Sequence, residues 1–321
     1  MSFLQFGFRP AFSAAAVLLS VSLAASADHS LPPHGGGAVQ SHGHGAPGLL
    51  ARPPRWSPGE LVLKGAGCPI ETPDGLSLMV ASGRAGGHGD LDIWVIDRPA
   101  IGASWSEPKN LPAPVNSASA DFCPAPLERS LYFISAEPRP GACGGGDIYF
   151  SRQSPAGAWS EPVHLPCAPD GPNTPGTERS PSFVETWYGS FLFFSTNEGV
   201  PNAKEDIHVS IMNDKGAFGP GYVVEALSTP GYEDQMPTVR ALNGDFEITF
   251  NSDRPGTKSE PVFGGQDAYH ARASFLPFWW SKPQNAGPNV NTSANETRAT
   301  LSWDGKRLYV GRGDVYVSER R

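Results

Sequence analysis

The sequence has few charged residues and no cluster of basic ones. Asp, Glu, Lys and Arg together make up 17% of the chain, and the formal net charge is −8. A nucleic-acid-binding surface needs a basic patch, which this balance does not supply. Beyond residue 27, no apolar run is long enough to cross a membrane. We therefore expect neither a nucleic-acid partner nor a membrane span.

Several motifs of known chemistry are also missing. The chain contains no Gly-x-Ser-x-Gly nucleophile turn, phosphate-binding loop, dinucleotide fingerprint or His-Glu-x-x-His. No stretch places apolar residues at helical spacing. Gly (37) and Pro (33) are instead abundant, which is typical of many short strands joined by turns. The composition predicts an all-β protein, and nothing in it indicates a cofactor.

The first 54 residues differ in composition from the rest. Residues 1–27 have the features of a secretory signal peptide: a positive charge at Arg9, an apolar run over 14–25 and a small-residue cleavage site at 25–27. Residues 28–54 are rich in Gly, Pro and His and cannot bury a core, so we expect a flexible linker. Weak Zn or Cu binding by its histidines is a less favoured alternative. The mature protein is predicted to be periplasmic or secreted.

One short pattern recurs along the remaining chain. Asp147-Ile-Tyr-Phe precedes Trp159-Ser-Glu-Pro, and the step from Asp to aromatic residue is 13, 12, 12 and 13 residues in the four complete copies. Asp314 heads a fifth copy that lacks its aromatic residue, whereas Trp56 begins a copy that lacks its Asp. Five copies of each half, offset by one, describe a ring that is closed by its own ends.

The spacing of the copies indicates a β-propeller. Successive aromatic positions lie 49, 54, 59 and 62 residues apart, and periods of roughly 50 residues that carry several strands indicate propeller blades. Hairpin turns are expected at Asp74-Gly75, Asn243-Gly244 and Asp304-Gly305. We predict a single five-bladed β-propeller over residues 55–321. In it, the N-terminal strand pairs with the C-terminal blade and removes an open sheet edge.

The repeat resembles the WD-repeat-like propeller repeat of the bacterial TolB type. The resemblance covers about residues 55–320 and rests on Asn-Ser/Thr-x3-Asp/Glu-x2-Pro, Leu-Tyr-Phe-x-Ser, Gly-Gly-x-x-Asp-Ile-Tyr and Trp-Ser-x-Pro-x-Asn-Leu. TolB is a periplasmic propeller that docks envelope proteins, so the resemblance implies a partner of that kind. The chain departs from TolB in having five readable blades and no recognisable N-terminal α/β domain.

Acidic residues recur near the start of the first strand of the predicted blades. Blade one has Ala66 at this position, and the other four blades have Asp121, Glu178, Asp234 and Glu296. These carboxylates would ring one mouth of the central channel, near Arg84 and Arg254, and pairing with arginines or loop amides is the favoured role. Ligand binding and glycosidase-type catalysis rank lower, because a catalytic set should break the repeat symmetry. Asp234, next to Glu233, alone hints at such a break.

Two further features complete the predicted site. Trp279 is extra to the repeat and is equally well interpreted as a stacking platform for a sugar or as a packing residue; we include it in the ligand-binding set at the channel mouth. The four cysteines are an even number in an exported chain and predict two disulfides. Their register favours Cys68–Cys123 and Cys143–Cys167 among the three possible pairings. No Cys-x-x-Cys spacing supports a metal site.

These observations favour an exported, non-catalytic binding or scaffold module of the cell envelope. We expect it to act as a monomer and to contact an envelope protein or a glycan through the channel-mouth face. The alternative is a carbohydrate-active hydrolase that uses some of the channel-mouth carboxylates.

Overall fold

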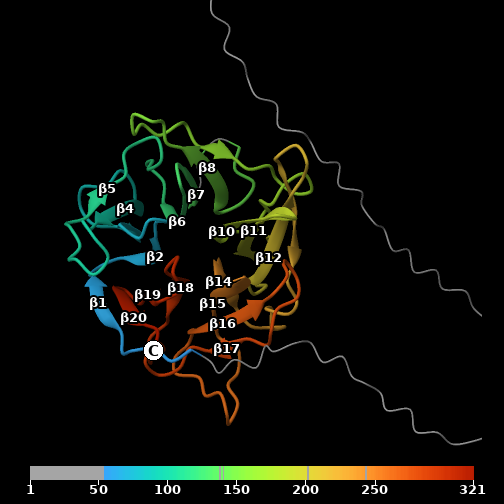
Figure 1. The fold of residues 1–321 in the computed structure, drawn as a ribbon. Helices are drawn as coiled ribbons and strands as arrows, with labels where there is room; N and C mark the ends of the chain where they lie inside the picture. Colours follow the sequence, from blue (N-terminus) through green and yellow to red (C-terminus); the bar gives the residue numbers. More distant parts are fainter. Residues whose placement is uncertain (1–53, 137–138, 140, 201, 243) are drawn as a thin grey trace, which may run out of the picture. The chain divides into compact units, whose positions relative to one another are not determined.

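The structure, a computed structural model, describes residues 54–321 except 137, 138, 140, 201 and 243. This part of the chain contains 20 strands in five four-stranded antiparallel sheets and no helix. Figure 1 shows the sheets arranged around a common axis. The prediction of an all-β, five-bladed propeller is confirmed. The predicted signal peptide and, apart from Pro54, the predicted linker lie outside the described residues.

Each blade is one sheet whose strands run outward from the axis in chain order. Blade one consists of β2 (Gly67–Glu71), β3 (Ser77–Ser82), β4 (Asp92–Asp97) and β5 (Lys109–Asn110). Blade two consists of β6 (Asp121–Leu127), β7 (Ser130–Ser135), β8 (Asp147–Arg152) and β9 (Val163–His164). Blade three consists of β10 (Arg179–Thr186), β11 (Gly189–Thr196), β12 (Asp206–Met212) and β13 (Phe218–Val223).

The last two blades follow the same plan, with one exception at the closure. Blade four consists of β14 (Asp234–Leu242), β15 (Asp245–Ser252), β16 (Asp267–Ala273) and β17 (Gln284–Asn285). Blade five takes three strands from the C-terminal part of the chain and its outermost strand from the N-terminal part: β18 (Thr297–Leu301), β19 (Arg307–Gly311), β20 (Val315–Glu319) and β1 (Glu60–Leu63).

The ring closes through this shared blade, as predicted. Strand β1 pairs antiparallel with β20, and Trp56 forms an isolated bridge with Arg320. The Arg320 guanidinium also lies 4.9 Å from the centre of the Trp56 ring, which is buried. Because both ends of the propeller are hydrogen-bonded in one sheet, β20 is paired on both sides and both ends are held in the fold.

The hydrophobic core lies between adjacent blades. One large cluster joins blades three and four and includes the buried side chains Phe193, Val209, Phe250, Tyr269 and Trp280. Successive side chains of a strand point to opposite faces of its sheet, and each face packs against a neighbouring sheet. In the part of the chain that the structure describes, no helix is long and apolar enough to span a membrane.

A bulge interrupts the innermost strand of every blade at the same register. The pairing of this strand with the second strand shifts just after its start in all five sheets. A non-glycine residue at the bulge has positive φ in each case, a conformation that such residues rarely adopt. These residues are Cys68 (47°), Cys123 (49°), Ser180 (48°), Met236 (57°) and Arg298 (40°). A bulge changes the direction in which its side chain points. Here the five bulges occupy equivalent positions in the five inner strands.

Candidate functional site

The four predicted channel-mouth acids are buried. Each has 0% exposed surface and accepts a hydrogen bond from a Ser or Thr that lies four or five residues earlier in the chain. These bonds close the loop that leads into the first strand. The four residues are Asp121, Glu178, Asp234 and Glu296. Their contacts are those of residues that hold a loop, and their direct contact with a ligand stays a prediction.

Three of these acids pair with an arginine that follows the second strand of the same blade. The pairs are Asp121–Arg139 (3.0 Å), Asp234–Arg254 and Glu296–Arg312 (3.8 Å). Arg254 is therefore at the mouth, as expected from the sequence. The sequence analysis missed Arg139, which lies within a longer loop.

Blades one and three break this pairing in opposite ways. Blade one has the arginine without the acid, and Arg84 donates instead to Ser82 Oγ and to the Lys64 carbonyl. Blade three has the acid, but no arginine of the described residues is paired with Glu178, whose partners are the hydroxyls of Thr174 (2.6 Å) and Thr196 (2.8 Å). Burial raises the pKa of Glu178 to about 8. This carboxyl is therefore mostly protonated at neutral pH.

Trp279 is not brought together with the four acids. It lies between β16 and β17, at the end of the sheet where β14 turns into β15, whereas Asp234 stands at the opposite end of β14. Its indole is 78% exposed and its ring centre lies 6.3 Å from that of Phe275. The prediction that Trp279 lies at the channel mouth is wrong. The sequence does not show at which end of the third strand the insertion that carries Trp279 lies.

A second set of carboxylates lies at the mouth between blades three and four. It consists of Glu205, Glu233 and Asp253, which come directly before β12, before β14 and after β15. These positions break the repeat. In the other blades, the residues that correspond to Glu205 are Leu91, Gly146, Gln266 and Gly313. Only the Glu233 position was noted from the sequence, although comparing the blades position by position would have found all three.

Glu205 is the most enclosed member of the set. Its Oε1 accepts from Arg179 Nε at 2.6 Å and its Oε2 accepts from Ser195 Oγ at 2.9 Å. The side chain is 12% exposed. Burial raises the pKa of Glu205, and the charge of Arg179 only partly opposes that shift. Glu205 therefore holds a proton more readily than a carboxyl in water does.

Glu233 and Asp253 are more open and share one cation. Lys204 Nζ lies 3.1 Å from Glu233 Oε1 and 3.9 Å from Asp253 Oδ2. Backbone hydrogen bonds link the set in a chain, because Glu205 N donates to Glu233 Oε2 (2.8 Å) and Glu233 N donates to Asp253 Oδ1 (2.6 Å). The neighbouring Asp206 also has a raised pKa, first through burial and then through the charge of Asp234.

The environments of these carboxyls are unequal. A desolvated carboxyl with a raised pKa, next to carboxylates that are partly solvated, is the arrangement that acid–base catalysis needs. Among the described residues, one His/Cys/carboxylate group has metal-ligand spacing, namely Cys143, His164 and Cys167. Its two cysteines are joined in a disulfide, and the group lies outside this carboxylate set.

Both predicted disulfides are confirmed. Cys68–Cys123 joins the bulges of β2 and β6 across neighbouring blades, with a Cα–Cα distance of 5.1 Å. Cys143–Cys167 joins the loop before β8 to the loop after β9, with a Cα–Cα distance of 5.9 Å. Both bonds therefore stabilise blades one and two.

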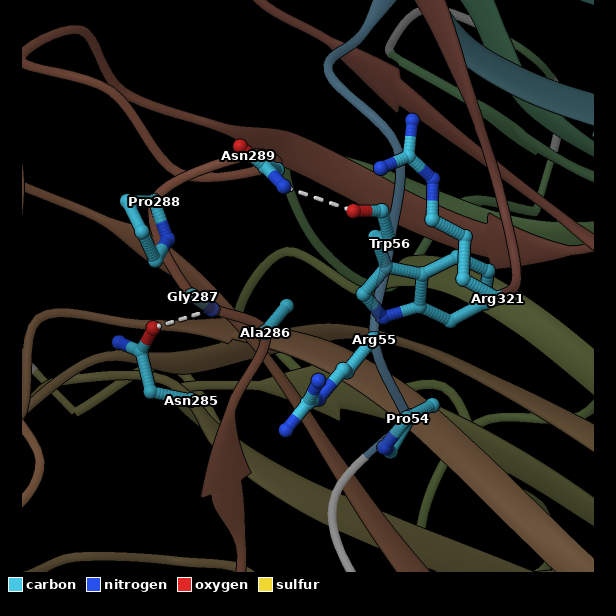
Figure 2. Close-up of a pocket in the computed structure, with 9 residues that line it drawn as sticks. All are labelled: Pro54, Arg55, Trp56, Asn285, Ala286, Gly287, Pro288, Asn289 and Arg321. Carbon is cyan, nitrogen blue, oxygen red and sulfur yellow. Dashed lines mark hydrogen bonds between the residues drawn. The ribbon is translucent and has the colours of Figure 1, made fainter.

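A cavity of about 720 Å³ lies at the closure of the ring rather than at the channel mouth (Figure 2). Its lining includes the charged groups of Arg55 and Arg321 and no carboxylate side chain. Asn289 Nδ2 donates to the Trp56 carbonyl at 2.7 Å, so this amide contributes to the closure. Without a carboxylate, this cavity cannot supply a general acid and base.

Comparison with known proteins rests on structure alone, because no family model and no curated protein matches the sequence. The α-L-arabinofuranosidase PaAbf62A from Podospora anserina matches with a TM-score of 0.55 at 9% identity, over 84% of this chain and 97% of that one. The catalytic domain of a Coprinopsis cinerea GH62 α-L-arabinofuranosidase has a TM-score of 0.54 at 12% identity, over 84% and 97%. An endo-arabinase from Bacteroides thetaiotaomicron has a TM-score of 0.51 at 12% identity, over 83% and 97%.

The shared fold is a five-bladed β-propeller. At these identities the likeness establishes the fold and not the activity. The similar structures are glycoside hydrolases rather than TolB-type propellers, so the TolB resemblance is wrong. The prediction of a non-catalytic envelope module is overturned by the same finding.

Proposed function

We propose that this protein is a glycoside hydrolase whose active site lies at the channel mouth between blades three and four. One observation carries the proposal: three carboxylates of unequal environment gather there at positions where the repeat does not require them. The similar structures, named as arabinofuranosidases and an endo-arabinase, support an arabinose-containing glycan as the substrate class.

Each carboxyl has a distinct role in this scheme. Glu205 is the proton donor, because burial raises its pKa and favours the protonated acid. It gives its proton to the glycosidic oxygen as the bond to the anomeric carbon breaks. Asp253 is the base that takes a proton from the attacking water, since its Oδ2 has Lys204 as a partner only at 3.9 Å. Glu233 positions Lys204 and Glu205: its Oε1 pairs with the Lys204 ammonium group, and its Oε2 accepts a hydrogen bond from the backbone N–H of Glu205.

The buried acid ring supports this site without reacting. Asp234 fixes the start of β14, immediately after Glu233, and Arg254 fixes the end of β15, immediately after Asp253. The Asp234–Arg254 pair therefore sets the spacing of the two open carboxylates. We propose the same supporting role for Asp121, Glu178 and Glu296 in their own blades.

An exported enzyme fits the rest of the chain. Two disulfides are typical of proteins in an oxidising compartment, and polymeric glycans are substrates outside the cytoplasm. We propose a periplasmic or secreted location on this basis.

The proposal is tested by incubating the purified protein with arabinan, arabinoxylan, unsubstituted xylan and 4-nitrophenyl α-L-arabinofuranoside. We expect release of arabinose or arabino-oligosaccharides from at least one arabinose-containing substrate and none from unsubstituted xylan. Proton NMR of the first product then gives its anomeric configuration. Absence of release from every substrate, over the range from pH 4 to 8, would overturn the proposed activity.

A further inference from the structure

The innermost strands of blades three, four and five carry hydrogen-bond donors without partners. Arg298 is fully buried and Arg240 is 3% exposed. Nε and Nη1 of Arg298 and Nη2 of Arg240 have no hydrogen-bond partner among the described residues. The buried hydroxyls of Ser180 and Thr238 also lack one. Buried polar groups are almost always hydrogen-bonded, so this concentration on three strands needs an explanation.

These groups lie around the propeller axis. Arg298 occupies the bulge of β18, and its Nη2 donates to the Pro181 carbonyl of β10 at 3.4 Å. Blades five and three are not neighbours, so this side chain reaches across the axis. Figure 1 shows β14 between β10 and β18 in the order of the inner strands around the centre. Arg240 on β14 reaches toward β18 as well, because its Nε donates to the Leu301 carbonyl at 3.1 Å.

Among the described residues, no carboxylate forms an ion pair with Arg298 or Arg240, and the Arg240 guanidinium lies 4.4 Å from the centre of the Trp303 ring. Burial, and then the charge of Arg240, lower the pKa of Arg298 to about 9, so both guanidinium groups remain positive at neutral pH. Glu71 is the carboxylate that acts on Arg240, but its oxygens are held by Arg98, Arg307 and Tyr309. A buried charge without a partner is strongly destabilising. A water molecule would fill hydrogen bonds here but would not offset the charge.

We propose that the channel binds a small inorganic anion of the halide class between Arg298 and Arg240, with the Ser180 and Thr238 hydroxyls as further donors. Every unpartnered atom of these four residues can donate, and guanidinium and hydroxyl donors are what an anion requires. The unpartnered atoms are enclosed, so the expected ion is monatomic rather than a tetrahedral oxyanion. This site is separate from the carboxylates of the proposed active site and does not depend on that function.

The anion site is tested by thermal unfolding of the purified protein after dialysis into chloride-free buffer. Titration with sodium chloride should raise Tm saturably, by roughly 5 °C or more at high occupancy. Sodium sulfate at equal ionic strength stabilises proteins only through exclusion from their surface and should give no saturable rise. Arg298→Met should abolish the chloride response. Arg129→Met, which removes an exposed arginine in the turn between β6 and β7, should keep it.

Bromide provides a second measurement that does not require the Arg298 variant to fold. Crystals of the unmodified protein soaked in sodium bromide should show an anomalous peak beside the Arg298 and Arg240 guanidinium groups. The proposal is overturned if chloride gives no saturable rise in Tm beyond that with sulfate, or if bromide produces no peak at the axis.

Discussion

Two pairs of charged residues at the mouth of blade four lie one position apart in the sequence but have different surroundings. Asp234 and Arg254 form a buried ion pair that recurs in two other blades. Glu233 and Asp253, each one residue earlier, are partly exposed, share Lys204 and have no counterpart in the repeat. The comparison indicates that repeated carboxylates build a blade, whereas carboxylates that break the repeat are free for chemistry.

The largest expected effect tests whether the carboxylates that break the repeat take part in the reaction. Glu205→Gln should lower kcat by about 10²- to 10⁴-fold, because the variant cannot donate a proton, while Tm changes little. Steady-state kinetics on the arabinose-containing substrate, with Glu161→Gln as an exposed control, measures the effect. A variant that keeps more than a third of the activity would remove Glu205 from the mechanism.

The second effect tests the structural half of this comparison. Asp234→Ala should lower the free energy of unfolding by about 3–5 kcal/mol, since it leaves the Arg254 charge buried and unpaired. Asp97→Ala removes one partner of the exposed Lys109–Asp97 pair (3.2 Å) and should cost about 0–1 kcal/mol. Urea unfolding of both variants gives the comparison, and equal costs would contradict the assignment of Asp234 as a structural residue.

Glu178 sharpens the comparison because it is a repeated acid without its arginine. Its folded-state pKa of about 8 lies above the usual pKa of 4.5, so the protonated form favours folding. The resulting stability is fully present below about pH 4.5 and is lost as the pH rises through 8, by up to about 1.4 kcal/mol per pH unit. Urea unfolding at pH 5, 7 and 9 should show this decline relative to Glu178→Gln. A parallel pH dependence of the two proteins would show that Glu178 is ionised in the fold.

The smallest effect concerns the shared cation. Lys204→Met should leave stability nearly unchanged, because Lys204 is largely exposed and surface ion pairs contribute little. It should lower kcat/KM on the arabinose-containing substrate, because Glu233 and Asp253 lose the cation that lies between them. An unchanged kcat/KM in this variant would mean that Lys204 does not position the two carboxylates.

The propeller, its closure and its disulfides were predictable because repetition encodes them. The offset between Asp314 and Trp56 defined the shared blade, and the common register of Cys68 and Cys123 defined a bond between neighbouring strands. The same repetition misled the assignment of family. The repeated residues specify how a blade packs, so they are compatible with propellers of different activity.

The rest of the site depends on features that the repeat conceals. The bulge that turns Arg298 across the axis interrupts the two-residue alternation of a strand, so its side chain could not be placed from the sequence. Arg139 pairs with Asp121 from a longer loop, where register is lost. Glu205 and Asp253 depart from the repeat in the sequence, but only the structure shows that Glu233 links them through backbone hydrogen bonds.

The account's central claim is tested most directly by one measurement on two variants of blade four. Asp253→Asn and Asp234→Asn make the same chemical change, one at the proposed base and the other at the structural carboxylate of the same blade. Sugar release and the free energy of unfolding are measured for each variant. We predict that Asp253→Asn loses hydrolysis by at least about 10²-fold with unchanged stability, whereas Asp234→Asn loses stability. Full hydrolysis by a folded Asp253→Asn protein would contradict the claim.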